Sequence, residues 1–250
     1  AGFRPDYTVT TYTKILKSLF PDTPVLIGGI EASLRRVTHY DYWKNTLMPS
    51  ILIDSGADFL LYGMGEQVVR EVAKSMHSGF NPKRIRGIRQ VAFVADKEYV
   101  ERLDRSKTIF LNSFERCKAD KHAFGQNFVT VETESNLLQA ENILVEPTGD
   151  KFVVINPMNA ALTTEQIDYA FDLPYMRAPH PRYNGRGDIP AWMMIRHSVN
   201  IHRGCFGGCA FCDSCASGGG RNDLEKFGRL RRCRTTRAWW QSRHKRSAAS

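Results

Sequence analysis

Short apolar segments that end at glycine-containing turns constrain the fold of this chain more than any other feature. Residues 24–27 are followed by Gly28-Gly29, and residues 58–62 are followed by Gly63-Met64-Gly65. Apolar residues at helical spacing accompany these segments, and they predict helices over 7–20, 30–36 and 67–76. Strands that alternate with helices predict an α/β fold with a parallel sheet covered on both faces.

The next part of the chain is less regular but keeps the same character. Strands are expected over residues 91–94, 108–111 and 152–155. Helices are expected over 113–124 and 163–171, the second with Thr163 or Thr164 as its cap.

A proline-rich segment separates this region from the rest of the chain. Pro174, Pro179 and Pro181 lie within eight residues of one another, a density that excludes regular structure. We interpret 173–190 as a linker between a domain of residues 1–172 and a second folding unit. Residues 193–201 are then predicted to form a strand that leads into a group of cysteines.

Three cysteines in the pattern C-x3-C-x2-C carry the clearest chemistry of the chain. They are Cys205, Cys209 and Cys212, with Phe211 directly before the last. A cubane cluster needs thiolates that converge from one side, and the glycines at 204, 207 and 208 let a short loop curl around it. The cysteines therefore predict a [4Fe–4S] cluster whose fourth iron has no protein ligand and is open to a small molecule.

A fourth cysteine leaves two alternatives open. Cys215 extends the pattern to C-x3-C-x2-C-x2-C. Its thiolate could fill the fourth iron, or the four thiols could bind Zn²⁺, although structural zinc sites usually pair two knuckles across a longer gap.

Several segments, in order along residues 1–212, resemble the YgiQ family of radical S-adenosylmethionine (SAM) proteins. The matching segments are Ile30-Glu31-Ala32-Ser33-Leu34-Arg35-Arg36, His39-Tyr40-Asp41-Tyr42-Trp43, Leu61-Tyr62-Gly63, Leu173-Pro174-Tyr175, Pro179-His180-Pro181 and Ser198-Val199-Asn200-Ile201-His202-Arg203-Gly204-Cys205-Phe206-Gly207-Gly208-Cys209.

The resemblance implies a fold and a chemistry. The fold would be an incomplete Rossmann-like domain of the cobalamin-binding type, followed over 191–212 by the first strand and cluster loop of a truncated radical SAM (β/α) barrel. Cys205, Cys209 and Cys212 would bind the cluster, and Phe211 would pack beside the cluster and SAM. Reductive cleavage of SAM would give a 5′-deoxyadenosyl radical, with an electron donor such as flavodoxin or ferredoxin. Cobalamin itself is not expected, because its coordinating histidine would be sought before residue 1, and the substrate is not implied.

The resemblance ends at Cys212. Only 38 residues follow, whereas a (β/α) barrel takes on the order of 200 residues or more. We therefore expect a fragment or an aberrantly terminated product, whose own catalytic competence is in question.

The formal net charge of +9 is concentrated in the last part of the chain. Residues 213–250 hold eight Arg and two Lys against three acidic residues, and they are poor in aliphatic side chains. We expect this tail to be disordered, and we do not expect a nucleic-acid partner in spite of Trp239-Trp240. Crowded cysteines without a secretion signal or an apolar membrane span predict a cytoplasmic location.

Some polar residues have a structural and a functional interpretation. The glycine turns could be tight connections or part of a nucleotide-like site. Glu31, Arg35 and Arg36 could line a pocket or form a solvated helix face. His39–Trp43 could pack in the core, form an interdomain contact or edge a substrate site. Structural roles are preferred for His180 and His202, and Cys117 is expected to be a lone buried thiol.

Overall fold

The computed structural model describes residues 6–137, 139–176 and 178–198. Contacts divide this part of the chain into one compact unit up to residue 160 and a second unit that begins at residue 161. The predicted metal ligands and the basic tail of 213–250 lie outside the described residues.

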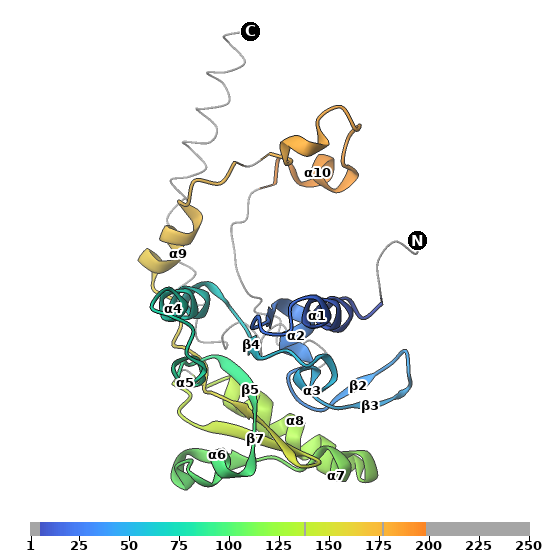
Figure 1. The fold of residues 1–250 in the computed structure, drawn as a ribbon, viewed down its shortest axis with the longest axis vertical. Helices are drawn as coiled ribbons and strands as arrows, with labels where there is room; N and C mark the ends of the chain where they lie inside the picture. Colours follow the sequence, from blue (N-terminus) through green and yellow to red (C-terminus); the bar gives the residue numbers. More distant parts are fainter. Residues whose placement is uncertain (1–5, 138, 177, 199–250) are drawn as a thin grey trace. The chain divides into compact units, whose positions relative to one another are not determined.

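The first unit is an α/β domain built on a six-stranded sheet (Figure 1). The strands lie in the order β1-β4-β5-β8-β7-β6. Their bounds are β1 Leu26–Gly28, β4 Phe59–Leu61, β5 Val91–Ala95, β6 Thr108–Phe110, β7 Ile143–Thr148 and β8 Lys151–Ile155. A separate hairpin pairs β2 (His39–Asp41) with β3 (Thr46–Met48).

The sheet is mixed, so the prediction of a parallel sheet is wrong for its centre. The pairs β1–β4 and β6–β7 are parallel, whereas β4–β5, β5–β8 and β7–β8 are antiparallel. The physical reason is clearest at β7–β8, where only Gly149 and Asp150 connect the strands. A two-residue turn can join only antiparallel neighbours, and Gly149 has the positive φ of 59° that such turns favour.

Helices cover both faces of the sheet, as the alternation of strand and helix predicted. Side chains of one face pack with α2 (Gly29–Leu34), α3 (Ile51–Ser55) and α8 (Lys121–Ser135). Side chains of the other face pack with α4 (Glu66–His77), α5 (Pro82–Arg86) and α6 (Lys97–Glu101). Along β5, Ala92 belongs to the first cluster and Val91 and Phe93 to the second. The two cores thus follow the twofold alternation of a strand.

The first unit also contains the helices α1 and α7. Helix α1 (Thr8–Leu19) confirms the helix predicted over 7–20, and Val9 packs against the first core. The helix predicted over 113–124 is two helices, α7 (Phe114–Ala119) and α8. They separate at Asp120, whose side chain accepts a hydrogen bond from the His122 N–H at 2.8 Å and so starts the second helix.

The second unit contains α9 (Thr164–Phe171), a 3₁₀ turn η2 (Pro181–Tyr183) and α10 (Pro190–Ile195). Thr163 caps α9 as expected: its hydroxyl accepts from the Gln166 N–H at 3.3 Å, and the Gln166 side chain accepts from the Thr163 N–H at 2.9 Å. One 3₁₀ turn thus falls inside the segment interpreted as a linker.

The strand predicted to begin at Met193 is wrong over its described part. Residues 190–195 are helical, with the Met193 N–H bonded to the Ile189 carbonyl at 3.0 Å and the Arg196 N–H bonded to the Trp192 carbonyl at 2.8 Å. Pro190 occupies the first turn, where its missing N–H is not needed. The residues of this predicted strand from 199 onward lie outside the described part of the chain.

Candidate functional site: the carboxyl edge of β1 and β4

The loops after β1 and β4 lie at the same edge of the sheet, because these strands are parallel and Gly28 pairs with Leu61. A Cβ on Gly28 would lie 3.1 Å from the Leu61 carbonyl oxygen, which is closer than side chains normally approach. Gly29 and Gly63 have φ of 81° and 68°, in the left-handed region. Backbone geometry therefore accounts for these glycines as tight turns, one of the two interpretations that the sequence allows.

The β4 loop is held by the buried side chain of Gln90, the residue directly before β5. Gln90 is 3% exposed and has a φ of 65°, a conformation that costs a non-glycine residue on the order of 1 kcal/mol or more. Its Nε2 donates to the carbonyls of Tyr62 at 2.5 Å and Met64 at 2.7 Å. The Gly63 N–H donates to the Ser33 hydroxyl at 3.2 Å. The β4 loop is thus fixed to α2 and to the residue directly before β5.

Arg36 is buried in this edge and does not lie on a solvated helix face. It is 4% exposed, donates to the Ser33 carbonyl at 2.6 Å and to the Ser135 hydroxyl at 3.2 Å, and lies 5.2 Å from the Tyr62 ring centre. The Tyr62 hydroxyl donates to the Asn156 carbonyl at 2.5 Å, and burial raises its pKa. This arrangement joins α2 to the ends of β4, α8 and β8 as structural support.

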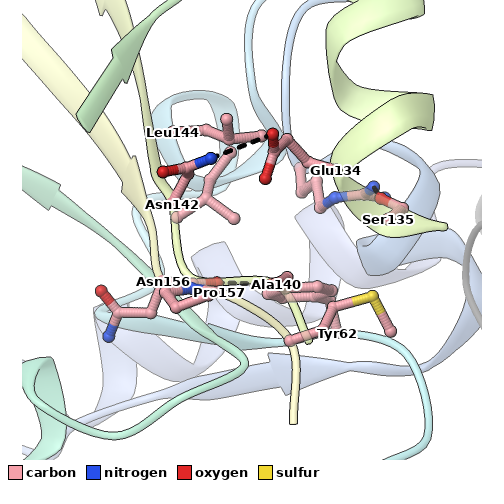
Figure 2. A pocket seen from close by; sticks show the side chains of 11 residues that line it. Tyr62, Glu134, Ser135, Ala140, Asn142, Leu144, Asn156 and Pro157 are labelled. Atoms are coloured by element: carbon pink, nitrogen blue, oxygen red, sulfur yellow. Dashed lines mark hydrogen bonds between the residues drawn. The ribbon is translucent and has the colours of Figure 1, made fainter. Parts of the chain in front are cut away.

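A small cavity lies beside Arg36 and Tyr62, with Glu134 and Asn142 on its wall (Figure 2). Its volume is about 20 Å³, enough for roughly one water molecule. The Asn142 amide donates to Glu134 Oε1 at 3.1 Å, and Glu134 Oε2 is buried without a hydrogen-bond partner among the described residues. Two polar side chains thus face the cavity, but it is too small for a nucleotide or a cobalamin.

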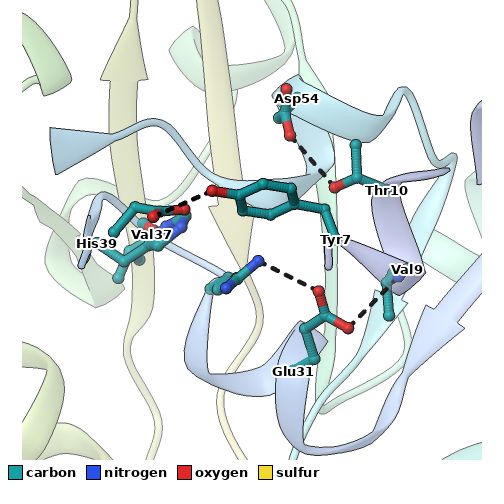
Figure 3. A network of polar contacts seen from close by, with 9 residues as sticks. Tyr7, Val9, Thr10, Glu31, Val37, His39 and Asp54 are labelled. Carbon is teal, nitrogen blue, oxygen red and sulfur yellow. Dashed lines mark hydrogen bonds and ion pairs between the residues drawn. The ribbon is translucent and has the colours of Figure 1, made fainter. Parts of the chain in front are cut away.

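A polar network ties α1 to α2 (Figure 3). Glu31 accepts from the Arg35 guanidinium at 3.2 Å and from the Val9 N–H at 3.4 Å. The Arg35 guanidinium carbon lies 5.4 Å from the centre of the Tyr7 ring. These contacts support a structural role for Glu31 and Arg35 in joining the two helices, and not a role in lining a pocket.

The hairpin residues Tyr40–Trp43 divide between core and surface. Asp41 is 2% exposed and accepts from the Lys44 N–H at 3.0 Å and the Tyr7 hydroxyl at 3.2 Å. Burial by itself would raise the pKa of Asp41, but these hydrogen bonds outweigh it and hold the pKa below its ordinary value. Tyr40, Tyr42 and Trp43 are each more than half exposed.

His39 and His180, two of the described histidines, have structural surroundings. Burial lowers the pKa of His39, whose Nδ1 lies 3.2 Å from the Val37 carbonyl. His180 is exposed and its Nδ1 accepts from the Arg182 N–H at 3.1 Å, which starts η2. The structural role preferred for His180 is consistent with this cap.

Cys117 is a lone buried thiol, as predicted. It is 1% exposed, and its sulfur accepts from the Asn127 amide at 3.2 Å. Burial, assisted by the nearby Glu146 carboxylate, raises its pKa to about 11. A thiol with so little thiolate at neutral pH is a poor nucleophile and a poor metal ligand.

Sequence reasoning missed one buried acid, Glu146 on β7. Both of its oxygens lie near the Thr38 N–H, at 2.8 and 3.1 Å, and the residue is fully buried. Burial raises the pKa of Glu146 to about 7. The available signal was a single charged residue that follows the apolar run Ile143–Val145.

The residues predicted to bind the cluster cannot be placed in this geometry. Cys205, Cys209, Phe211 and Cys212 lie outside the described residues, and so do Cys215, His202 and the tryptophans of the tail. Across 6–137, 139–176 and 178–198, no group of three or more His, Cys, Asp or Glu is arranged to hold a metal ion. Within the same ranges, no helix is long and apolar enough to cross a bilayer.

Layered helices around a mixed sheet, with tight glycine turns at the carboxyl edge of β1 and β4, define an α/β domain compatible with a Rossmann-like class. The chain belongs to the radical SAM family, since residues 1–198 match the family described as Radical SAM N-terminal. This match, together with the similarity to curated relatives, confirms the resemblance to the YgiQ family.

The relatives carry the name UPF0313 protein. One from Porphyromonas gingivalis is 50% identical over 213 residues, which is 85% of this chain and 33% of the relative. One from Bacteroides thetaiotaomicron is 46% identical over 220 residues, covering 84% of this chain and 35% of the relative. One from Rhodopseudomonas palustris is 42% identical, with 84% and 33% covered. The chain spans about a third of the length of these relatives, and no solved structure matches it.

Proposed function

We propose that this chain is the N-terminal part of a radical SAM protein, in which Cys205, Cys209 and Cys212 bind a [4Fe–4S] cluster and the open iron binds SAM. The observation that carries the proposal is the C-x3-C-x2-C pattern in a chain of the radical SAM family.

The donor set fits this cluster. Three thiolates serve three of the four irons of a cubane, and thiolate sulfur is the ligand that iron–sulfur clusters use most. All three cysteines fall within eight residues, with Gly207 and Gly208 between the first two. Glycines at these positions let the backbone bend closely around a bulky group.

The chain's own residues have distinct tasks in this proposal. The three thiolates hold the cluster and leave one position open, and Phe211 packs beside the cluster and SAM to exclude water. When bound, the cluster and SAM supply one-electron reductive cleavage of a sulfonium to a 5′-deoxyadenosyl radical. The α/β domain precedes this loop in the chain, and its β4 loop is held by Gln90 and Ser33.

The same proposal implies an electron donor and a cellular compartment. Reduction of the cluster requires an electron donor such as flavodoxin or ferredoxin, and stable thiolates require a reducing compartment such as the cytoplasm. The substrate is the part of the reaction that neither the motif nor the fold specifies.

Metal content tests the ligand assignment. The full chain is reconstituted with iron and sulfide under anaerobic conditions, and bound iron and sulfide are measured beside the absorbance spectrum. Cys205→Ala, Cys209→Ala and Cys212→Ala should each lose most of the cluster. The matched control is Cys233→Ala, because Cys233 is the remaining cysteine outside the motif region and Cys117 is buried. Equal cluster content in all four variants would contradict the assignment.

The second candidate is a non-catalytic iron–sulfur or zinc module, and Cys215 is the observation that favours it. Four thiolates could close the cluster or bind Zn²⁺. Under our proposal, Cys215→Ala keeps its iron and sulfide and binds SAM as the unchanged chain does. If this variant binds SAM and the unchanged chain does not, the four-thiolate site is the correct description.

A further inference from the structure

The β2–β3 hairpin presents aromatic side chains to solvent. Tyr40, Tyr42 and Trp43 are 54%, 67% and 64% exposed, and the rings of Tyr42 and Trp43 are 4.8 Å apart. Figure 1 shows the hairpin reaching away from the six-stranded sheet. With about 150–250 Å² for each aromatic side chain, the three leave roughly 350 Å² in water, the size of patch that often serves binding.

The aromatic tip, defined as Tyr40, Tyr42 and Trp43, is held in place before any partner binds. Buried Asp41 accepts the Lys44 N–H and the Tyr7 hydroxyl, and the Tyr40 hydroxyl donates to Asn45 Oδ1 at 2.5 Å. At the base of the hairpin, Thr38 donates to the buried Glu146. Because the loop is already ordered, a partner would not have to supply the free energy of ordering it.

The charges around the tip favour an apolar protein surface over nucleic acid. Between residues 39 and 48 the sequence has one lysine, Lys44, and one aspartate, Asp41. The Lys44 ammonium lies 4.8 Å from the centre of the Tyr7 ring and is directed to that ring. Nucleic-acid surfaces need several cations that neutralise phosphates, whereas Trp and Tyr without net charge are typical of the centre of a protein interface.

We propose that the aromatic tip docks into an apolar pocket on the rest of the longer family chain, that is, on the two thirds of the relatives' length that this chain does not match. The relatives from three organisms are about three times as long as the matched region. That additional polypeptide is covalently linked to the domain, so it is present at high effective concentration. The inference does not depend on the cluster and would hold if the cysteines bound another metal.

Hydroxyl-radical footprinting compares two chains: this chain alone, and a chain in which residues 1–198 replace only the residues aligned with them in the full-length P. gingivalis relative. The oxidation rates of Tyr42 and Trp43 should fall by at least about fivefold in the longer chain, because side chains at an interface centre are desolvated. Phe93, which is fully buried, reports folding and should stay unmodified in both. The fusion chain could fail to fold. The same oxidation rates are therefore also measured on the unaltered full-length relative, at the positions aligned with residues 42 and 43.

Variants add an independent readout. Trp43→Ser should lower the melting temperature of the longer chain and leave that of this chain unchanged, while Phe128→Ser, at a 55% exposed position on α8, serves as the matched control. Equal oxidation of the tip in both chains would overturn the proposal. If the tip of this chain alone becomes protected as the chain concentration rises, the tip binds a second copy. If it becomes protected only when an oligonucleotide is added, the tip binds nucleic acid. Either result would overturn the proposal.

Discussion

Replacing the buried acid Glu146 by Gln should remove a specific pH dependence of stability. The carboxyl group is fully buried on β7, and its pKa is raised to about 7 from an ordinary value of 4.5. Since one pH unit corresponds to about 1.4 kcal/mol, ionising this group in the folded state costs about 3 kcal/mol more than in the unfolded state.

The direction follows from proton binding. Between about pH 4.5 and 7 the folded chain holds the Glu146 proton more tightly than the unfolded chain does. The contribution to stability is therefore complete below the ordinary pKa and is lost as the pH rises through the folded pKa. His39 acts in the opposite sense because its pKa is lowered, but it is the same in both proteins and cancels in their difference.

Urea unfolding followed by circular dichroism, from pH 5 to pH 8.5, measures this difference. Relative to the unchanged chain, Glu146→Gln should gain about 2.5 kcal/mol between the two ends of the range, because at pH 5 part of the contribution is already lost. A control variant, Glu98→Gln, changes a side chain that is 75% exposed and should give a flat difference. A flat difference for Glu146→Gln as well would refute the argument that burial governs this carboxyl group.

Three further predictions concern local features. Gly28→Ala should cost about 1–3 kcal/mol in urea unfolding, because its Cβ would press on the Leu61 carbonyl, whereas Gly125→Ala on α8 meets no atom within 4 Å and should not destabilise; equal effects would contradict this. Cys117 should resist iodoacetamide at pH 8 in the folded chain and react in urea, because burial raises its pKa to about 11; rapid labelling when folded would count against it. Thr163→Ala should cost about 1 kcal/mol of protection against hydrogen exchange in α9, and unchanged protection would show that the cap is dispensable.

Elements with a local signal were predictable from the sequence. The apolar runs predicted β1, β4, β5, β6 and β8, and the Thr163 and Gln166 pair is a local capping pattern that starts α9. Strand β7 was not predicted, because Glu146 and Pro147 interrupt its apolar run. Burial of the Glu146 carboxylate is compensated by the N–H of Thr38, which lies 108 residues away in the chain. Residues 193–195 were predicted as a strand because a short apolar run has no distinguishing period, and the Pro190 start decides it.

The candidate site also has one part that was predictable from local sequence and one part that was not. The cysteine pattern is local, so its chemistry can be proposed from spacing alone. The support of the carboxyl edge could not be predicted, because Gln90 reaches carbonyls 26 and 28 residues away and Arg36 reaches Ser135. Neither contact follows from periodicity or composition. They depend on which strands become neighbours, and the mixed sheet order decides that.

The most direct test of the central claim is electron paramagnetic resonance of the reconstituted, reduced full chain before and after SAM is added. If Cys205, Cys209 and Cys212 leave one iron open, the cluster signal should change on adding SAM, and Cys215→Ala should respond alike. The same reductant should release 5′-deoxyadenosine from SAM with a chain continued through the full length of the relatives. An intact cluster whose signal is the same with and without SAM would contradict the account.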